Sequence, residues 1–333
     1  MVALLSLIGE GKMLKDLFYR LFYLLFFSMI LICQLSAGGH TSYKKWPLPL
    51  AKERREKRSS QRRNGALGIR KFHRDNFIVL TGRETGMFHV FDCVCNLIRC
   101  YEVGNCRGIE VNFGTHGVYY EPSHGKNWWS YYCKPIRFGQ EINVKAVSGG
   151  GSYINFLRKK TVRKEIFNLV QRYIHIKEHI KTKIDIFEKE NFKNSFVISV
   201  HYRGTDKIAE APYVSYEKVS EEVVKVLKKS GDKKYKIFVA TDEQAFLDYM
   251  INLFGDRVCY YKDAIRSTNG IPVHLDKKLD HYKCGEDALV DCILLSRGNF
   301  LIRSSSNLSR WSTYFNPNIP VVELNTRYNI HQP

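Results

Sequence analysis

The second half of the chain alternates segments that predict β-strands with segments that predict helices, and this pattern constrains the fold most. Five short apolar runs predict strands at residues 195–201, 236–240, 257–260, 299–302 and 320–324. Helices are predicted at residues 215–230, 243–254, 285–296 and 307–315. Short, continuously apolar strands are typical of a sheet covered by helices on both faces. The alternation therefore predicts an α/β fold with a doubly wound parallel sheet, which binds ligands at the carboxyl ends of its strands.

The first half predicts a smaller α/β region. It has a strand at residues 77–80, a helix at 87–101 and a second strand at 109–113. The aromatic segment at residues 127–132 indicates core or interdomain packing rather than a cofactor site, and residues 155–192 predict charged helices. We therefore expect two domains, an N-terminal α/β domain at residues 73–193 and a ligand-binding C-terminal domain at residues 194–333.

The first 75 residues differ from the rest in charge and hydropathy. They hold 15 Lys/Arg and 5 Asp/Glu, a net of +10 out of +19 for the whole chain. Residues 40–72 predict a basic linker or stalk, and because no aromatic platform accompanies the charge, we expect no nucleic-acid partner. Residues 1–39 contain an apolar run that predicts either an uncleaved membrane anchor or a signal peptide cleaved after Ala37.

The expected localisation follows from that apolar run. We predict a single-pass membrane protein that contacts the membrane through its N-terminal segment. In a eukaryote the body would lie in the lumen, as in a Golgi enzyme, whereas in a bacterium the positive-inside bias would keep it cytoplasmic at the inner membrane.

A cluster of four cysteines is a candidate zinc site. Cys93, Cys95, Cys100 and Cys106 do not have the spacing of two C-x2-C pairs, and no suitable histidine pair follows them. Core packing is the better interpretation.

Polar side chains follow the first strand of the second half. His201 lies at the strand end, and Arg203 offers a fork of donors that suits two phosphate oxygens. Gly204 permits close approach of the backbone, and Asp206 is placed to hold Arg203 or Lys207. An ordinary structural ion pair is the alternative interpretation.

Two further polar clusters follow later strands, and we expect all three to open onto one crevice. Thr241 and Asp242 follow the second strand, with helix capping as the alternative. Ser305, Ser306 and Asn307 lie at a helix start, where hydroxyl and backbone N–H groups can bind a diphosphate or simply cap the helix.

Two carboxylates lie four residues apart on one predicted helix. Asp287 and Asp291 share a helix face. A carboxylate at this place can accept the N1 and N2 hydrogens of guanine, which adenine does not offer, although the spacing alone also fits two surface acids.

The motifs together resemble those of the α1,6-fucosyltransferases. This family comprises the enzymes that modify the core of N-glycans and the rhizobial nodulation enzymes. The sequence HYRGTDK at residues 201–207 is similar to their H-x-R-x-x-D-K motif, and FVATD at residues 238–242 resembles their second motif. Residues 287–310 resemble the third. The resemblance implies a GT-B-like fold of two facing Rossmann-like domains and an inverting, metal-independent transfer from a GDP-sugar, with no further cofactor.

The resemblance also implies roles for individual residues. Arg203 would bind the β-phosphate, His201 would form part of the nucleotide pocket, and Asp291 would contact guanine. The Ser305–Asn307 turn would contact the phosphates. Glu210 matches the acidic residue that acts as the base only if one residue is deleted after Lys207.

Two departures from the family pattern concern the phosphate site. The second arginine of the first motif is replaced by Gly204, and the glycine-rich phosphate loop of the N-terminal domain is not recognisable near Gly86.

The sequence therefore predicts a fucosyltransferase that moves fucose from GDP-fucose to a hydroxyl of a glycan or glycoconjugate. Its partners would be the GDP-sugar donor and the glycan acceptor. Two alternatives stay open: a transferase for another nucleotide sugar, and a catalytically silent, membrane-tethered protein that binds a sugar nucleotide or a glycan.

Overall fold

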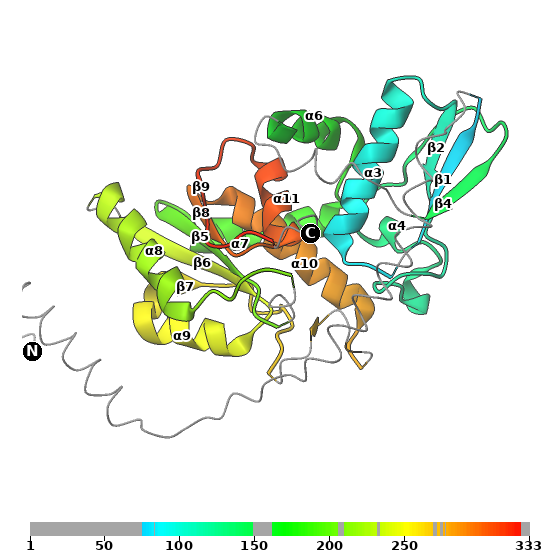
Figure 1. Ribbon diagram of the computed structural model, residues 1–333. Helices are drawn as coiled ribbons and strands as arrows, with labels where there is room; N and C mark the ends of the chain where they lie inside the picture. The colour runs from blue at the N-terminus through cyan, green and yellow to red at the C-terminus, as the bar shows by residue number, and fades with distance from the viewer. Residues whose placement is uncertain are drawn as a thin grey trace, which may run out of the picture. The chain divides into compact units, whose positions relative to one another are not determined.

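A computed structural model describes residues 75–82, 84–148, 162–205, 210–231, 234–268, 272–273, 276 and 278–327 (Figure 1). The predicted anchor or signal peptide at residues 1–39 and the predicted linker at residues 40–72 lie outside the described residues. Asp206 and Lys207 of the first motif also lie outside them.

The prediction of a single-pass membrane protein is corrected. Within the described ranges, no helix combines the length and the apolar content that a bilayer span requires. The long helices α3 (Met87–Glu102) and α10 (His281–Arg297) have 16 and 17 residues, short of the roughly 20 apolar residues needed.

The first sheet has the strand order β3-β2-β1-β4. Its strands are β1 (Phe77–Thr81), β2 (Gly108–Val111), β3 (Arg137–Gly139) and β4 (Lys145–Ser148). β1 pairs in parallel with β2 and β4, and β2 pairs antiparallel with β3. The predicted strand at 77–80 and helix at 87–101 are confirmed, and α3 lies against this sheet (Figure 1). We call this part the N-terminal lobe.

The aromatic segment packs between the lobes, as predicted. It includes the short helix α4 (Trp129–Tyr132) and follows the 3-10 turn η3 (Pro122–His124). Trp129 is fully buried, and its ring centroid lies 4.9 Å from that of Phe91 in α3. Phe91 in turn lies 5.1 Å from Trp311 of the other lobe.

Over its described part, residues 162–192, the predicted helical region contains two helices. They are α6 (Arg163–Tyr173) and α7 (Glu178–Asn191). Between them the chain is extended, because the backbone N–H of Lys134 donates to the His175 carbonyl at 2.8 Å and that of Lys177 donates to the Tyr132 carbonyl at 2.8 Å. This extended pairing separates the helices.

The second sheet is entirely parallel, with the strand order β7-β6-β5-β8-β9. The strands are β5 (Phe196–Tyr202), β6 (Tyr235–Thr241), β7 (Val258–Cys259), β8 (Phe300–Arg303) and β9 (Val321–Glu323). All five overlap the predicted strands, and we call this part the C-terminal lobe. Both lobes lie in one compact unit of the chain.

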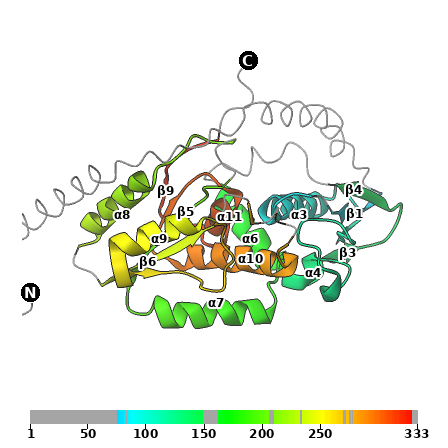
Figure 2. The same cartoon turned by 90° about the horizontal axis from the view of Figure 1, so that it is seen from below.

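Both faces of this sheet are buried, because alternate side chains enter different clusters. Ile198 and Val239 pack in the cluster that includes α8 (Tyr216–Ser230) and α9 (Gln244–Phe254). Val197 and Phe238 pack on the other side, in the cluster that includes residues of α7 and α10. Figure 2 shows α8 and α7 on opposite sides of the strands. The predicted doubly wound α/β fold is confirmed.

Most predicted helices of this lobe have nearly the predicted bounds. The exception is α10, which begins four residues earlier than predicted, at His281, because the Asp280 side chain accepts from the Lys283 N–H at 3.0 Å and caps the helix. The first turn of α10 also contacts the N-terminal lobe. His281 Nδ1 lies 2.8 Å from the Val118 carbonyl oxygen, and the Tyr132 hydroxyl donates to the Tyr282 carbonyl at 2.9 Å.

The cysteine cluster packs in the core, as predicted. Cys93 and Cys95 are buried in α3, Cys106 is buried just before β2, and Cys100 is half-buried.

Candidate active site

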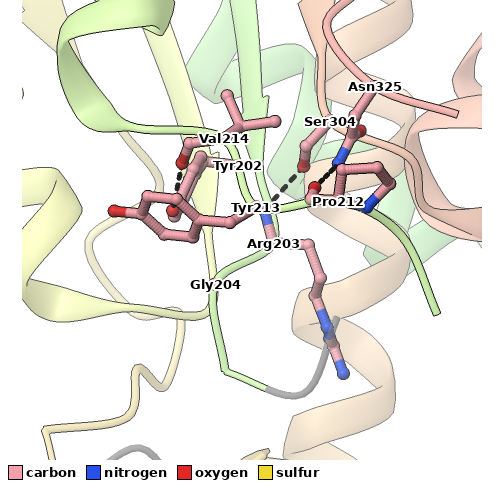
Figure 3. A pocket seen from close by; sticks show the side chains of 8 residues that line it. All are labelled: Tyr202, Arg203, Gly204, Pro212, Tyr213, Val214, Ser304 and Asn325. Atoms are coloured by element: carbon pink, nitrogen blue, oxygen red, sulfur yellow. Dashed lines mark hydrogen bonds between the residues drawn. The ribbon is translucent and has the colours of Figure 1, made fainter. Parts of the chain in front are cut away.

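The first motif begins at the carboxyl end of β5. The Arg203 backbone N–H donates to Ser304 Oγ at 2.9 Å, and the Ser304 N–H donates to the His201 carbonyl at 3.0 Å. These bonds join the ends of neighbouring strands β5 and β8, so the first and third polar clusters lie together. Figure 3 shows the Arg203 side chain extending away from Ser304 and Asn325.

Asp242, at the end of β6, organises the first motif. Its Oδ2 lies 3.1 Å from Arg203 Nε and accepts from Thr205 Oγ1 at 2.6 Å. Its Oδ1 accepts from the Gly204 N–H at 3.2 Å. A carboxylate with these partners fixes the direction of the arginine side chain. The second predicted cluster therefore supports the first.

Two side chains lie close to Gly204. A Cβ atom there would collide with the Glu243 carboxylate, whose side chain can move, and would lie 2.8 Å from Tyr202 Cε1. Burial raises the pKa of Glu243, a hydrogen bond from Tyr216 lowers it, and Asp242 raises it. In the family's first motif a second arginine stands at the position of Gly204. In this chain the Glu243 carboxylate, which follows the end of the neighbouring strand β6, occupies the space beside that position.

A cleft with a volume of about 220 Å³ lies between the lobes. Eight of the predicted site residues line it: His201, Arg203, Glu210, Thr241, Asp242, Asp291, Ser306 and Asn307. From the N-terminal lobe, the segment Gly86–His89 and Tyr119 contribute to the lining. The smaller pocket in Figure 3, of about 10 Å³, offers room for little more than one water molecule.

Two helices begin at the cleft. α3 starts after Gly86, which provides no side-chain cap, and the Met87 N–H donates to the Tyr119 hydroxyl at 3.2 Å. α11 (Asn307–Phe315) starts after Ser306. Helix N-termini carry partial positive charge and unpaired N–H groups, so the two together with Arg203 suit an anionic ligand.

Of the three carboxylates on α10, those of Glu286, Asp287 and Asp291, only Asp291 has an oxygen without a hydrogen-bond partner in the described part of the chain. Asp287 accepts from the Ile265 N–H at 3.1 Å and from the Lys283 ammonium. Asp291 is 7% exposed, and its Oδ1 has no partner among the described residues. Burial raises the pKa of Asp291 to about 7, and Arg266 acts in the opposite direction. Asp291 is therefore the available acceptor on this helix.

The serine-rich turn has mixed roles. Ser306 Oγ accepts from the Leu308 N–H at 3.3 Å, which is ordinary helix capping. The Ser305 N–H donates to Asn325 Oδ1 at 2.6 Å, and Ser305 is not among the lining residues of the cleft. Asn307 lines the cleft and accepts from Arg327 Nη2 at 3.0 Å.

Glu210, the predicted base, lines the same cleft. Its Oε2 is 3.5 Å from Arg327 Nη2, and its side chain is 33% exposed. Arg327 and Tyr119 were not predicted as site residues, because neither belongs to a recognised motif. No pattern in the sequence distinguishes them from other loop residues.

The sequence of this chain matches the model of a known protein family over the region that forms most of the cleft. A sequence model of the family described as Nodulation protein Z (NodZ) matches residues 155–330, more than half of the 333-residue chain. The chain belongs to the nodulation protein Z family. The predicted resemblance to fucosyltransferases of the rhizobial nodulation type is confirmed at the level of the family.

Solved structures with similarity to this chain include two of nodulation protein Z. NodZ alpha-1,6-fucosyltransferase soaked with GDP-fucose is 18% identical, covering 75% of this chain and 94% of that chain, with a TM-score of 0.49. Fucosyltransferase NodZ from Bradyrhizobium is 17% identical, covering 76% and 98%, also with a TM-score of 0.49. A mutant of FUT1 from Arabidopsis thaliana in complex with GDP is 10% identical, covering 84% and 58%, with a TM-score of 0.40. A comparison with curated proteins finds no match.

Proposed function

We propose that this member of the nodulation protein Z family transfers fucose from GDP-fucose to a hydroxyl group of a glycan or glycoconjugate, with inversion at the sugar carbon. Family membership supports the choice of fucose, since the solved family structure named above is a fucosyltransferase soaked with GDP-fucose. The observation that carries the proposal is the position of Arg203 in the same cleft as the N-termini of α3 and α11.

The leaving group is the first requirement of this chemistry. Negative charge develops on the diphosphate as the sugar departs, and preorganised donors stabilise it by a few kcal/mol each. In the proposed site the Arg203 guanidinium binds the β-phosphate, held in place by Asp242. The first turn of α11, beginning at Asn307, and the first turn of α3 supply N–H groups to the remaining oxygens.

The nucleotide base is the second requirement. Asp291 offers an oxygen without a partner among the described residues, at the buried end of the cleft lining. An ionised carboxylate can accept both the N1 and N2 hydrogens of guanine. His201 and Thr241 line the same cleft and complete the proposed nucleotide pocket.

The acceptor hydroxyl must lose a proton, which is the third requirement. Glu210 is the proposed base, because it lines the cleft and is partly exposed to an entering acceptor. The roles of Asp206 and Lys207 in donor binding stay predictions, since both lie outside the described residues.

The experiment that tests the proposal measures donor use directly. The wild type should release GDP from GDP-fucose, and Arg203→Ala should lose at least about 100-fold in kcat while remaining folded. Thermal-shift measurements with GDP, UDP and ADP should show stabilisation by GDP alone. Selective stabilisation by UDP would indicate another donor class, and GDP binding without sugar release would indicate a silent binder.

A further inference from the structure

The segment after β9 contacts two parts of the cleft that are distant in sequence. One part is the stretch Glu210–Val214, which follows the first motif. The other is the serine-rich turn Ser304–Asn307. Asn325 and Arg327 each bridge the two parts.

Asn325 connects the two parts through their backbones. Its Nδ2 donates to the Pro212 carbonyl at 2.6 Å, and its Oδ1 accepts from the Ser305 N–H at 2.6 Å. Figure 3 shows the hydrogen bond from Asn325 to Pro212, with Ser304 beside it. One amide side chain therefore holds the two backbones at a fixed separation.

Arg327 connects the same parts through their side chains. Its Nη2 donates to Asn307 Oδ1 at 3.0 Å and lies 3.5 Å from Glu210 Oε2. All three side chains line the cleft. Burial lowers the pKa of Arg327, and the Glu210 carboxylate acts in the opposite direction.

We infer that Arg327 is a positioning residue, which holds the Glu210 carboxylate at a fixed place relative to the first turn of α11. The inference rests on the proposed function, in which Glu210 is the base and that turn contacts the diphosphate. A base is effective only within hydrogen-bond reach of the acceptor hydroxyl while the donor is bound. The planar guanidinium presents several donors in a rigid fork, so it can orient a carboxylate and an amide together.

The test uses the full chain with water as the acceptor, and it measures GDP release from GDP-fucose and the Kd of GDP. Arg327→Gln should lower kcat by about tenfold or more, because it misplaces the base. Arg327→Lys keeps the charge without the fork and should recover part of the lost rate. Each change is also made in a Glu210→Gln background, where Arg327→Gln should alter kcat by less than about twofold, because residues that act as a unit are not additive.

Lys218→Gln is the matched control. Lys218 Nζ donates to the Leu324 carbonyl at 3.0 Å, so it holds the same segment, but it does not line the cleft. This variant loses one positive charge near the segment and should keep the wild-type kcat.

The outcomes separate the inference from the proposed function. A wild-type kcat in folded Arg327→Gln, or an equal loss in both backgrounds, overturns the positioning role alone. A wild-type kcat in Glu210→Gln removes the base assignment and the positioning role while leaving the donor site intact. If the wild type neither binds GDP nor releases it from GDP-fucose, the proposed function itself fails and the positioning role fails with it. Should Arg327→Gln not fold, Arg327→Lys in the two backgrounds gives the same comparison.

Discussion

Asp92 of α3 and Arg310 of α11 form a buried ion pair between the two lobes. The Asp92 carboxylate is completely buried, and its second oxygen accepts from Trp311 Nε1 at 2.8 Å. Asp92 lies five residues from Met87, the first residue of α3, and Arg310 lies three residues from Asn307, the first residue of α11. The pair therefore ties together the two helices that begin at the cleft.

Removing the Asp92 carboxylate should destabilise the fold strongly. Asp92→Ala leaves the Arg310 charge and the Trp311 N–H without a buried acceptor, so we expect a loss of about 3 kcal/mol or more in the free energy of unfolding. Urea denaturation measures this loss. Glu102→Gln is the control on the same helix, because Glu102 pairs with Arg172 at 2.8 Å near the surface, and it should cost less than about 1 kcal/mol. Similar losses in the two variants would contradict the structural role of the pair.

Asp291 should determine the preference for guanine. Inosine diphosphate lacks the N2 amino group of GDP, so it would leave part of the Asp291 carboxylate unpaired. The wild type should therefore bind GDP more tightly than inosine diphosphate by about 1–3 kcal/mol. In calorimetry, the Asp291→Asn variant should bind GDP and inosine diphosphate weakly and with similar Kd values. A preference for GDP that survives in Asp291→Asn would assign base recognition to another residue.

The same carboxyl should make the ligand-free protein less stable as the pH rises. Burial raises the pKa of Asp291 from the ordinary aspartate value of 3.8 to about 7, so the folded state binds a proton more tightly than the unfolded state does. The contribution of Asp291 to stability is therefore present below about pH 4 and decreases as the pH rises to about 7. Thermal unfolding of wild type and Asp291→Asn between pH 4 and 8 checks this. The asparagine variant should gain stability relative to wild type as the pH rises, and a constant difference would disprove the expectation.

Position 204 should accommodate a side chain poorly while Glu243 is present. In Gly204→Ala the new Cβ would meet the Glu243 carboxylate, so we expect a displaced first motif and a loss of about 1–3 kcal/mol in stability. GDP release from GDP-fucose should fall with it, because Arg203 adjoins this position. The double variant Gly204→Ala/Glu243→Ala removes the nearer obstacle and leaves Tyr202, so it should recover part of the stability lost in Gly204→Ala. If it does not, the steric explanation is wrong.

The sequence was most informative where a single physical rule determines the structure. β5 and β6 were predictable because strands buried on both faces are continuously apolar. β3 and β4 were not predicted, since they have three and four mostly exposed residues and no apolar run. The early start of α10 was missed because it depends on one capping side chain, that of Asp280.

The candidate site was predictable only where its residues follow strand ends. Spacing placed Asp287 and Asp291 on one helix face. It could not show that the Asp287 carboxylate already accepts hydrogen bonds from Lys283 and from the Ile265 N–H. Arg327 reaches the cleft from a loop 117 residues after Glu210, the acid that it contacts. Such contacts depend on the tertiary fold, and no local pattern encodes them.

The docking of the first turn of α10 on the N-terminal lobe limits how the cleft can open. His281 and Tyr282 are bonded to Val118 and Tyr132 of that lobe, whereas the same helix packs under β5 and β6 of the other. A hinge motion that widened the cleft would have to break these bonds or tilt the whole helix with the N-terminal lobe. If the helix tilted, Asp291, which lies two and a half turns further along it, would move relative to the ends of the strands. Opening of the lobes would then be coupled to release of the nucleotide.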